Sequence, residues 1–214
     1  MVKSFTFSLW GDNPKYGIGA IRNAQLALKL FPEWNCIFYY DNTVPKFYIN
    51  ILKEFSNTSL VKVEDNSFGA FWRFENMFET GDVILSRDTD SRLSMREKIL
   101  IDNWLETNYN FMVIRDHHNH YEFPILAGMW GKKNTVIPRP IKEVMNEFRF
   151  VKQYTIDQIF LRDVLWQHIM AQTAIYGVKE LAWMRETYDF EGKNFIGQTY
   201  DENDTPIYEG KIDG

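Results

Sequence analysis

The chain has 214 residues, of which 45% are hydrophobic and 16% aromatic, and its formal net charge is −5. This composition is ordinary for a globular protein, and the length fits one large domain or two small ones with a real core. The negative balance argues against a general nucleic-acid binder, which needs a basic face, and the single cysteine excludes an intrachain disulfide.

The first part of the chain alternates between strand and helix patterns. Residues 3–11 alternate in polarity and run into a Gly-Asp-Asn-Pro loop, which predicts a strand. Apolar residues then recur at helical spacing across 18–34, and Pro32 ends that helix. The same alternation continues with a strand at 35–41, a helix at 46–57, a strand at 59–65 and a short helix at 69–80.

The remaining segments follow the same rhythm. A Gly-Asp turn precedes a buried strand within 81–90, and Ser94 with Glu97 forms a capping box at the start of a helix over 94–108. Alternation at steps of roughly 30 residues predicts an α/β fold, with a mostly parallel central sheet flanked by helices. The later elements are a strand at 109–120, a glycine-punctuated segment at 125–133, and helices at 137–150 and 154–174.

Four predicted strands end in polar side chains. Ligands of open parallel sheets gather at the carboxyl ends of the strands, so these side chains are expected to share one site. The strand-end residues are Asp12, Asp41, the pair Asp88 and Asp90, and the segment from Asp116 to His120.

Asp88 and Asp90 lie one residue apart at the end of the 81–90 strand, between Arg87 and Arg92. Residues i and i+2 of an extended segment point the same way, so the two carboxylates repel each other unless a cation lies between them. Hard oxygen ligands suit Mg2+ or Mn2+, and the arginines would balance the carboxylates or reach the same phosphates. The competing interpretation is a surface turn with local ion pairs. The position after a buried strand favours the metal site.

An Asp-x-Asp after "VIL", in a chain with this alternation, resembles the nucleotide-sugar-dependent glycosyltransferases of the GT-A fold. The resemblance implies a GT-A-like (Rossmann-like) domain over 1–198, with 199–214 as an acidic strap over it or a linker to a longer, multidomain chain. Segments in the order typical of such transferases cover most of residues 4–165. They are "SLWGDNPKYGIGAIRNAQLA", "FYYDNTVP", "FWRFE", "RDTDSR", "IRDHHNHYEFPILAGMWG" and "YTIDQIFL".

In this family the first strand and its loop hold the base and ribose, and the second aspartate of the motif binds the metal directly. The resemblance therefore implies Asp90 as a metal ligand, and Asp88 as a second ligand or a holder of ribose and metal-bound water. For Arg73 the competing interpretation is an ion pair with Glu75 or Glu79, and for Trp10 it is core packing. The implied nucleotide and donor residues are Ser8, Leu9, Trp10, Gly11, Asp12, Tyr16, Asp41, Arg73, Arg87 and Asp88.

The densest polar segment is "RDHHNHYEFPILAGMWG". Its histidines suggest zinc, but further ligands at zinc spacing are lacking, and a sugar-binding loop is the preferred interpretation. Within it "AGMWG" resembles the glycine-rich segment beside the donor sugar, although a turn with the tryptophan in the core is the alternative. The implied sugar and acceptor residues are Asp116, His118, His120, Gly128 and Trp130.

"YTIDQIFL" resembles the Asp-Gln segment of retaining GT-A enzymes, which implies Asp157 and Gln158 as the catalytic residues. In an inverting enzyme such a carboxylate is the general base for the acceptor hydroxyl. In a retaining enzyme it stabilises an oxocarbenium-like centre, or the leaving phosphate takes the proton. Retention is favoured on this resemblance. The competing interpretation of Asp157 is a residue of the helix N-cap or first turn, which is compatible with either catalytic role.

Together these patterns predict a glycosyltransferase that needs Mn2+ or Mg2+ and moves a hexose from a nucleotide sugar, taken as UDP-linked, to a glycan or glycoprotein acceptor such as a viral capsid protein. One rival is a metal-dependent nucleotidyl- or phosphotransferase, although the pattern GxxxxGK[ST] is absent. The other is a non-catalytic carbohydrate-binding module, which would not need the strand-end aspartates. The absence of a signal-peptide pattern and of an apolar run of ~20 residues predicts a soluble cytoplasmic protein, in the host cytoplasm if the chain is viral, with no membrane span and no nucleic-acid partner.

Overall fold

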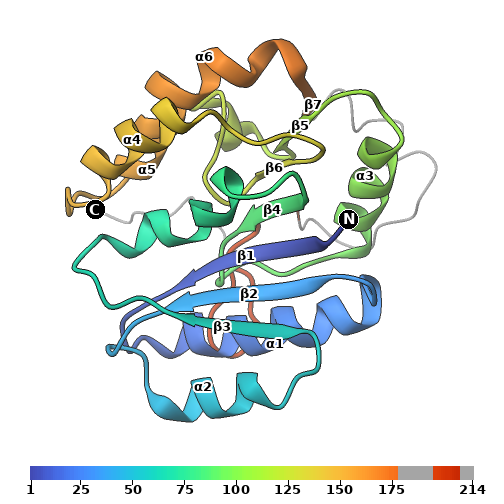
Figure 1. The fold of residues 1–214 in the computed structure, drawn as a ribbon. Coiled ribbons are helices and arrows are strands. Elements are labelled where there is room, and N and C mark those ends of the chain that lie inside the picture. Colours follow the sequence, from blue (N-terminus) through green and yellow to red (C-terminus); the bar gives the residue numbers. More distant parts are fainter. Residues whose placement is uncertain (178–194, 208–214) are drawn as a thin grey trace, which may run out of the picture.

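A seven-stranded sheet forms the centre of the molecule in the computed structural model, which describes residues 1–177 and 195–207 (Figure 1). The strand order is β3-β2-β1-β4-β6-β5-β7. The strands are β1 (Lys3–Leu9), β2 (Asn35–Tyr40), β3 (Thr58–Lys62), β4 (Val83–Arg87), β5 (Phe111–Arg115), β6 (Trp130–Lys132) and β7 (Thr173–Gly177).

The predicted mostly parallel sheet is confirmed. β1 pairs in parallel with β2 and β4, β2 with β3, and β5 with β7, whereas the short β6 runs antiparallel between β4 and β5. The carboxyl ends of β1 and β4 are therefore neighbours, because Phe7 lies opposite Arg87 in the register of the pair. This pairing brings the loop after β1 next to the Asp-Thr-Asp segment.

Helices cover both faces of the sheet. The first helix begins earlier than the predicted residue 18, because Asn13 caps it through Lys15 N–H (3.1 Å) and Pro14 occupies its first turn. Ser94 caps α3 as predicted, accepting the Glu97 N–H at 3.2 Å. The α-helices are α1 (Pro14–Leu30), α2 (Lys46–Lys53), α3 (Met95–Leu105), α4 (Arg139–Phe148), α5 (Ile156–Phe160) and α6 (Trp166–Ile169). The 3-10 helices are η1 (Gly69–Phe78), η2 (His118–Tyr121) and η4 (Met170–Gln172).

The helix predicted over 154–174 is present but is not uniform. α5 passes into a π-helical turn, η3 (Leu161–Leu165), before α6 and η4 continue to Gln172. The strand β7 then follows at once, and the sequence analysis did not predict it. Figure 1 shows α4, α5 and α6 gathered on one side of the molecule, away from α1 and α2.

Two hydrophobic clusters fill the space between the sheet and its helices. Leu85 belongs to the cluster beneath α1, α2 and α3, whereas its neighbour Ile84 belongs to the cluster with η1, α4 and α5. Because successive side chains of a strand point to opposite faces, one cluster lies on each face of the sheet. The core is thus a three-layer arrangement that leaves the carboxyl ends of β1 and β4 open between the helices.

The described part of the C-terminal segment lies against the end of β4. The Tyr200 N–H donates to the Asp90 carbonyl at 2.8 Å, and Asp204 accepts from Arg22 (2.7 Å) and Arg92 (3.0 Å). Residues 195–207 therefore brace the Asp-Thr-Asp loop against α1, and residues 208–214 of the predicted strap or linker lie outside the described residues. Within the described part of the chain, no helix combines the length and apolar character needed to cross a membrane.

Candidate active site

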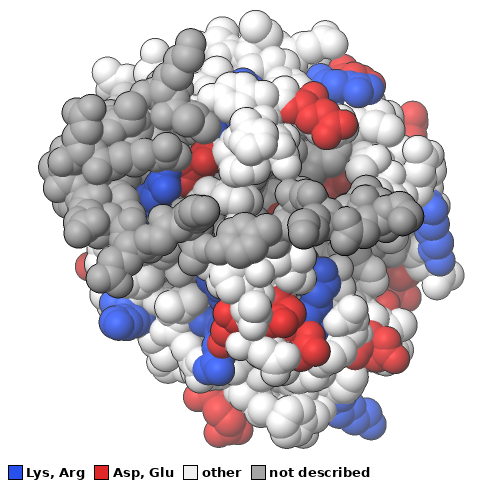
Figure 2. Space-filling model, turned by 180° about the vertical axis from the view of Figure 1, so that it is seen from behind, with Lys and Arg blue, Asp and Glu red and all other residues white. Residues whose placement is uncertain are grey.

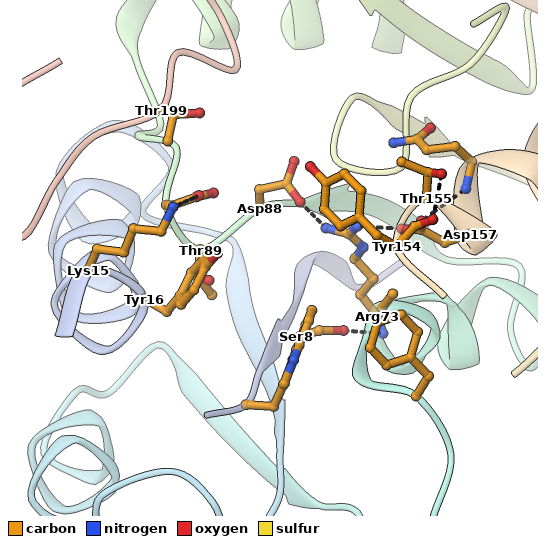
Figure 3. A pocket seen from close by; sticks show the side chains of 15 residues that line it. Ser8, Lys15, Tyr16, Arg73, Asp88, Thr89, Tyr154, Thr155, Asp157 and Thr199 are labelled. Carbon is orange, nitrogen blue, oxygen red and sulfur yellow. Dashed lines mark hydrogen bonds and ion pairs between the residues drawn. The ribbon is translucent and has the colours of Figure 1, made fainter. Parts of the chain in front are cut away.

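A pocket of about 340 Å³ opens at the carboxyl ends of β1 and β4 (Figure 3). Arg73 lies at its centre between Asp88 and Asp157, with Lys15, Tyr16 and Thr199 on one side and Tyr154 and Thr155 on the other. The described lining residues are Ser8, Trp10, Lys15, Tyr16, Phe68, Ala70, Arg73, Asp88, Thr89, Asp90, Tyr154, Thr155, Asp157, Gln158 and Thr199.

Arg73 is the buried cation that organises this pocket. Its side chain comes from η1, its Nη1 pairs with Asp88 Oδ1 and donates to the Arg87 carbonyl (3.3 Å), and its Nη2 pairs with Asp157 Oδ2 at 3.0 Å. The Arg73 N–H also donates to Ser8 Oγ at 3.0 Å, which ties η1 to the end of β1. The alternative pairing with Glu75 or Glu79 does not occur, because Glu75 pairs with Arg149 and both glutamates pair with Lys142.

Asp88 is placed by a close backbone approach as well as by Arg73. Gly128 precedes β6, and a Cβ added there would overlap the Asp88 carboxylate. Glycine is therefore required at this position for the aspartate to take its observed conformation. The close approach at Gly128 is therefore to Asp88, and its predicted contact with the donor sugar stays a prediction.

Asp90 pairs with Lys15 of α1 at 3.0 Å, whereas Asp88 and Asp157 pair with Arg73. The α1 helix carries Lys15 and packs tightly on the loop, since a Cβ on Gly19 would overlap the Thr89 carbonyl. Asn23 holds the same loop by donating to the carbonyl of Ser91 at 2.9 Å. The Lys15 pKa is raised, because the Asp90 carboxylate outweighs the lowering effect of burial. The pKa of Asp90 is also raised, first by burial and next by the charge of Asp88.

Asp157 lies in the first turn of α5 and is buried. Burial raises its pKa most, the charge of Asp88 adds to this, and Arg73 opposes it. Asp157 Oδ1 accepts the Gln158 N–H at 3.0 Å, and the Gln158 side chain accepts the Ala127 N–H at 3.1 Å. The Asp-Gln pair thus faces the Asp-Thr-Asp loop across Arg73, while it also begins a helix.

The chemistry of the donor set decides whether these residues suit a divalent cation. Asp88 and Asp90 supply hard carboxylate oxygens, and the pKa of Asp90 is raised first by burial and next by the charge of Asp88. The described lining holds three carboxylates against two cationic side chains, Lys15 and Arg73, so its formal charge is negative. No three metal-binding side chains converge within residues 1–177 and 195–207. The residues therefore fit a hard ion that takes its other ligands from water or a bound anion.

The structure corrects two predicted charged contacts. Arg87 was expected to reach phosphates, but its side chain is buried and pairs with the equally buried Glu97 of α3. Asp116 was expected to bind sugar hydroxyls, but it is buried, pairs with Arg96 and accepts the Ile196 N–H at 2.8 Å. Both side chains point into the protein, because their positions in β4 and after β5 face the helical layer that contains α3.

Two predicted contacts belong to the core instead. Trp130 is fully buried in β6, with its ring 5.7 Å from that of Phe74, so it offers no face to a sugar. Leu9 is also buried and belongs to the cluster beneath α1. Trp10, for which core packing was the alternative, is 38% exposed and lines the pocket above Gly69.

Other predicted residues lie outside the pocket lining. Asp41 accepts from Thr43, which in turn accepts the Gly11 N–H at 2.6 Å, so these residues form a closed turn beside β1. Gly11 has a φ of 77°, which explains the glycine there. Asp12 and His118 are exposed, and their predicted ligand contacts stay predictions.

The histidine loop forms an aromatic cluster rather than a polar surface. His117 stacks on Phe195 (4.2 Å between ring centroids), and His120 lies 5.3 Å from the same ring. Burial lowers the His120 pKa to about 4, with a further lowering by His117 and His118 and an opposing effect of Asp88. His120 therefore stays neutral near pH 7.

Several pocket residues were not predicted from the sequence. Lys15, Tyr154, Thr155 and Thr199 come from a helix start, a helix connection and the C-terminal segment. Tyr154 is 89% exposed, and Thr155 has a φ of 66°, a left-handed conformation that is uncommon for a β-branched residue. Tyr154 and Thr155 stand in the segment "YTIDQIFL", so their place directly before the Asp-Gln pair was a signal that the sequence offered.

No protein family and no curated protein matches the sequence. Among solved structures, the chain is similar to the galactosyltransferase LgtC in complex with donor and acceptor sugar analogues, at 14% identity and a TM-score of 0.49, over 80% of this chain and 72% of that one. It is similar to a glycosyltransferase involved in the glycosylation of the major capsid of PBCV-1, at 11% identity and a TM-score of 0.47, over 83% and 82%.

A further similar structure is 4-diphosphocytidyl-2C-methyl-D-erythritol synthase from Anaerococcus prevotii, at 10% identity and a TM-score of 0.48, over 82% of this chain and 88% of that one. These three proteins carry different names for their activities, and the similarities to them are weak. The activity of this chain is therefore inferred from its own residues and not from these similarities.

Proposed function

We propose that the chain is a GT-A-type glycosyltransferase that moves a hexose from a UDP-linked donor to a hydroxyl of a glycan or glycoprotein. The observation that carries this proposal is the placement of Asp88 and Asp157 on one buried arginine, at the carboxyl ends of β1 and β4. Residues from two distant parts of the chain thereby meet where open α/β sheets bind their ligands.

Asp88 and Asp90 would hold Mn2+ or Mg2+, which supplies Lewis-acid stabilisation of the charge on the leaving diphosphate. Trp10 and Tyr16 line the pocket beside β1 and are the contacts proposed for the base and ribose, together with Ser8. Arg73 places a positive charge between Asp88 and Asp157, and we propose that it contacts a phosphate or the donor sugar.

The transfer breaks the bond between the anomeric carbon and the diphosphate oxygen and forms one to the acceptor oxygen. In the retaining course that we favour, the acceptor proton passes to the leaving phosphate oxygen, while Asp157 stabilises positive charge at the anomeric carbon. In the inverting course Asp157 takes the proton, for which its raised pKa is suitable. Tyr154, exposed at the pocket mouth, would give the acceptor sugar an aromatic face.

Calorimetric titration with UDP, GDP and CMP, each with Mn2+ and then with EDTA, tests this function. We expect UDP to bind only with the metal, and UDP release from UDP-hexoses to follow. Binding of no nucleotide under either condition would overturn the proposal. Sugar binding that is indifferent to both nucleotide and metal would instead support a carbohydrate-binding module.

The second candidate is a nucleotidyltransferase. Lys15 favours it, because this lysine in the first turn of α1 lies in the pocket beside the paired carboxylates, where it could bind a triphosphate. Such an enzyme releases pyrophosphate from a nucleoside triphosphate, whereas the proposed transferase releases UDP from a sugar donor. Assaying both products on the same protein separates the two. The face shown in Figure 2 mixes acidic and basic side chains over its described residues, and these show no extended basic patch of the kind that binds a polyanion.

A further inference from the structure

The two aspartates of the Asp-Thr-Asp segment have cationic partners of different kinds. Asp88 pairs with Arg73, whose guanidinium is buried and also held by Asp157 and the Arg87 carbonyl. Among residues 1–177 and 195–207, the cationic side chain that pairs with Asp90 is Lys15, which is 22% exposed and carries its ammonium on a flexible stem. Arg73 is therefore held by several partners from different elements, whereas Lys15 is partly exposed and has the more flexible side chain.

The backbone on both sides of the Lys15–Asp90 pair is anchored. The Asp90 carbonyl accepts the Tyr200 N–H at 2.8 Å, and α1 is fixed to the loop through Asn23. The ammonium also lies 4.6 Å from the centre of the Tyr16 ring, within the pocket lining. A movement of the lysine side chain would therefore be enough to open this pair, with no shift of the helix or the loop.

A divalent ion on Asp90 would compete with this ammonium, because both are attracted to the same carboxylate and repel each other at short range. The displaced ammonium stays on its tether inside the pocket. A diphosphate bound in the same pocket would offer it another negatively charged partner. The same side chain thus opposes the metal when it arrives alone and favours it when it arrives with an anion.

We propose that Lys15 is a tethered competitor of the divalent cation, which occupies Asp90 in the free protein and moves to the donor diphosphate when metal and nucleotide bind together. The inference rests on the proposed metal-dependent use of Asp88 and Asp90. It adds a positioning residue from α1 that makes metal binding depend on the nucleotide. The expected order is weak binding of the metal alone and strong binding of the metal–nucleotide complex.

The test is Mn2+ binding to the whole chain, measured by electron paramagnetic resonance of free Mn2+ with and without UDP. Lys15→Met keeps the length and helix propensity of the side chain but removes the charge. Lys29→Met is the matched control, because it removes the same charge from the exposed last turn of the same helix. Far-ultraviolet circular dichroism and thermal unfolding establish that both variants are folded.

We expect Lys15→Met to bind Mn2+ alone about tenfold more tightly than the wild type, because the substitution removes a partly buried positive charge that competes with the metal. We expect its affinity for UDP in the presence of Mn2+ to fall about tenfold, and Lys29→Met to change neither value. A Lys15→Met variant with unchanged affinity for Mn2+ alone overturns the inference. A gain for Mn2+ with no loss for UDP overturns the move to the diphosphate. Failure of the wild type to bind UDP with Mn2+ overturns the proposed function instead, while the Mn2+ titration without UDP still decides the competition at Asp90.

Discussion

Arg73 Nη2 lies 3.0 Å from Asp157 Oδ2, although the two residues are 84 positions apart in the chain. The same guanidinium holds Asp88, so one buried side chain connects the Asp-Thr-Asp segment to the Asp-Gln segment. A planar guanidinium presents several donors in fixed directions and suits this bridging role better than an ammonium would. The relationship is the reason to treat these distant motifs as parts of one site.

Asp157→Asn tests the role of that carboxylate. The amide keeps the size of the side chain but can neither accept a proton nor stabilise positive charge as strongly, so turnover should fall by ~10²-fold or more. UDP binding with Mn2+ should stay within about twofold, because Asp88 and Asp90 are untouched. Asp163→Asn, which changes an exposed aspartate in η3, is the control. Near-normal turnover of Asp157→Asn would remove Asp157 from the mechanism.

Asp90→Asn tests the metal assignment. Loss of this carboxylate should abolish the effect of Mn2+ on UDP binding, while the thermal unfolding midpoint changes little, since the residue lies at a loop. Asp102→Asn removes an equal charge from the exposed face of α3 and should leave UDP binding as it is. Both variants are compared by calorimetry with Mn2+ and with EDTA. Metal-dependent binding that persists in Asp90→Asn would contradict the assignment.

Gly128→Ala tests the position of Asp88 without altering any charge. The added Cβ overlaps the Asp88 carboxylate, so the carboxylate must rotate away from its present place beside Arg73. We expect a loss of Mn2+-dependent UDP affinity of about tenfold or more, the size expected when a charged contact is lost. Gly81→Ala is the matched control, because nothing lies within 4 Å of its Cβ. Equal affinities in the two variants would show that Asp88 does not need its observed conformation.

Glu97→Gln tests whether Arg87 is structural. The substitution leaves the buried Arg87 guanidinium without its charged partner, and the free energy of unfolding should fall by about 3 kcal/mol. Glu143→Gln breaks an exposed i,i+4 pair with Arg139 and should cost no more than about 0.5 kcal/mol. Urea unfolding measures both. UDP binding by the folded fraction of Glu97→Gln should be normal, whereas a selective loss of binding would return Arg87 to the phosphate site.

His120 predicts a pH dependence of stability. Its pKa in the folded protein is about 4, against a usual value of 6.5, so the unfolded chain binds more protons between these values. Stability should therefore fall as the pH falls from 6.5 to 4, by up to about 3 kcal/mol. His117, His118 and Asp88 are the titratable groups that act on it.

Unfolding of His120→Gln across this pH range measures the effect. The variant should lose less stability than the wild type on acidification, because glutamine does not titrate. His168→Gln, at an exposed position of α6, should follow the wild-type curve. Parallel curves for the wild type and His120→Gln would mean that folding does not lower the pKa of His120.

Local patterns in the sequence determined most of the elements and the class of fold. The apolar run Val83–Leu85, the cap at Ser94 and the spacing of strands and helices act over a few residues, so they could be recognised without the fold. The carboxyl-end position of Asp88 and Asp90 followed from the same patterns. The strand β7 was not predicted, because its five residues follow directly on a helical run, with no turn between them.

Only the tertiary structure decided which strand-end residues share the pocket. Arg87 and Asp88 are adjacent, yet one faces the buried Glu97 and the other faces the pocket, because consecutive side chains at a strand end point to opposite sides. The sequence contains no signal for the contacts of Arg73 and Lys15 with the aspartates. Those contacts depend on the strand order and on how closely α1 and η1 pack against the end of β4, and both are properties of the assembled sheet rather than of any local segment.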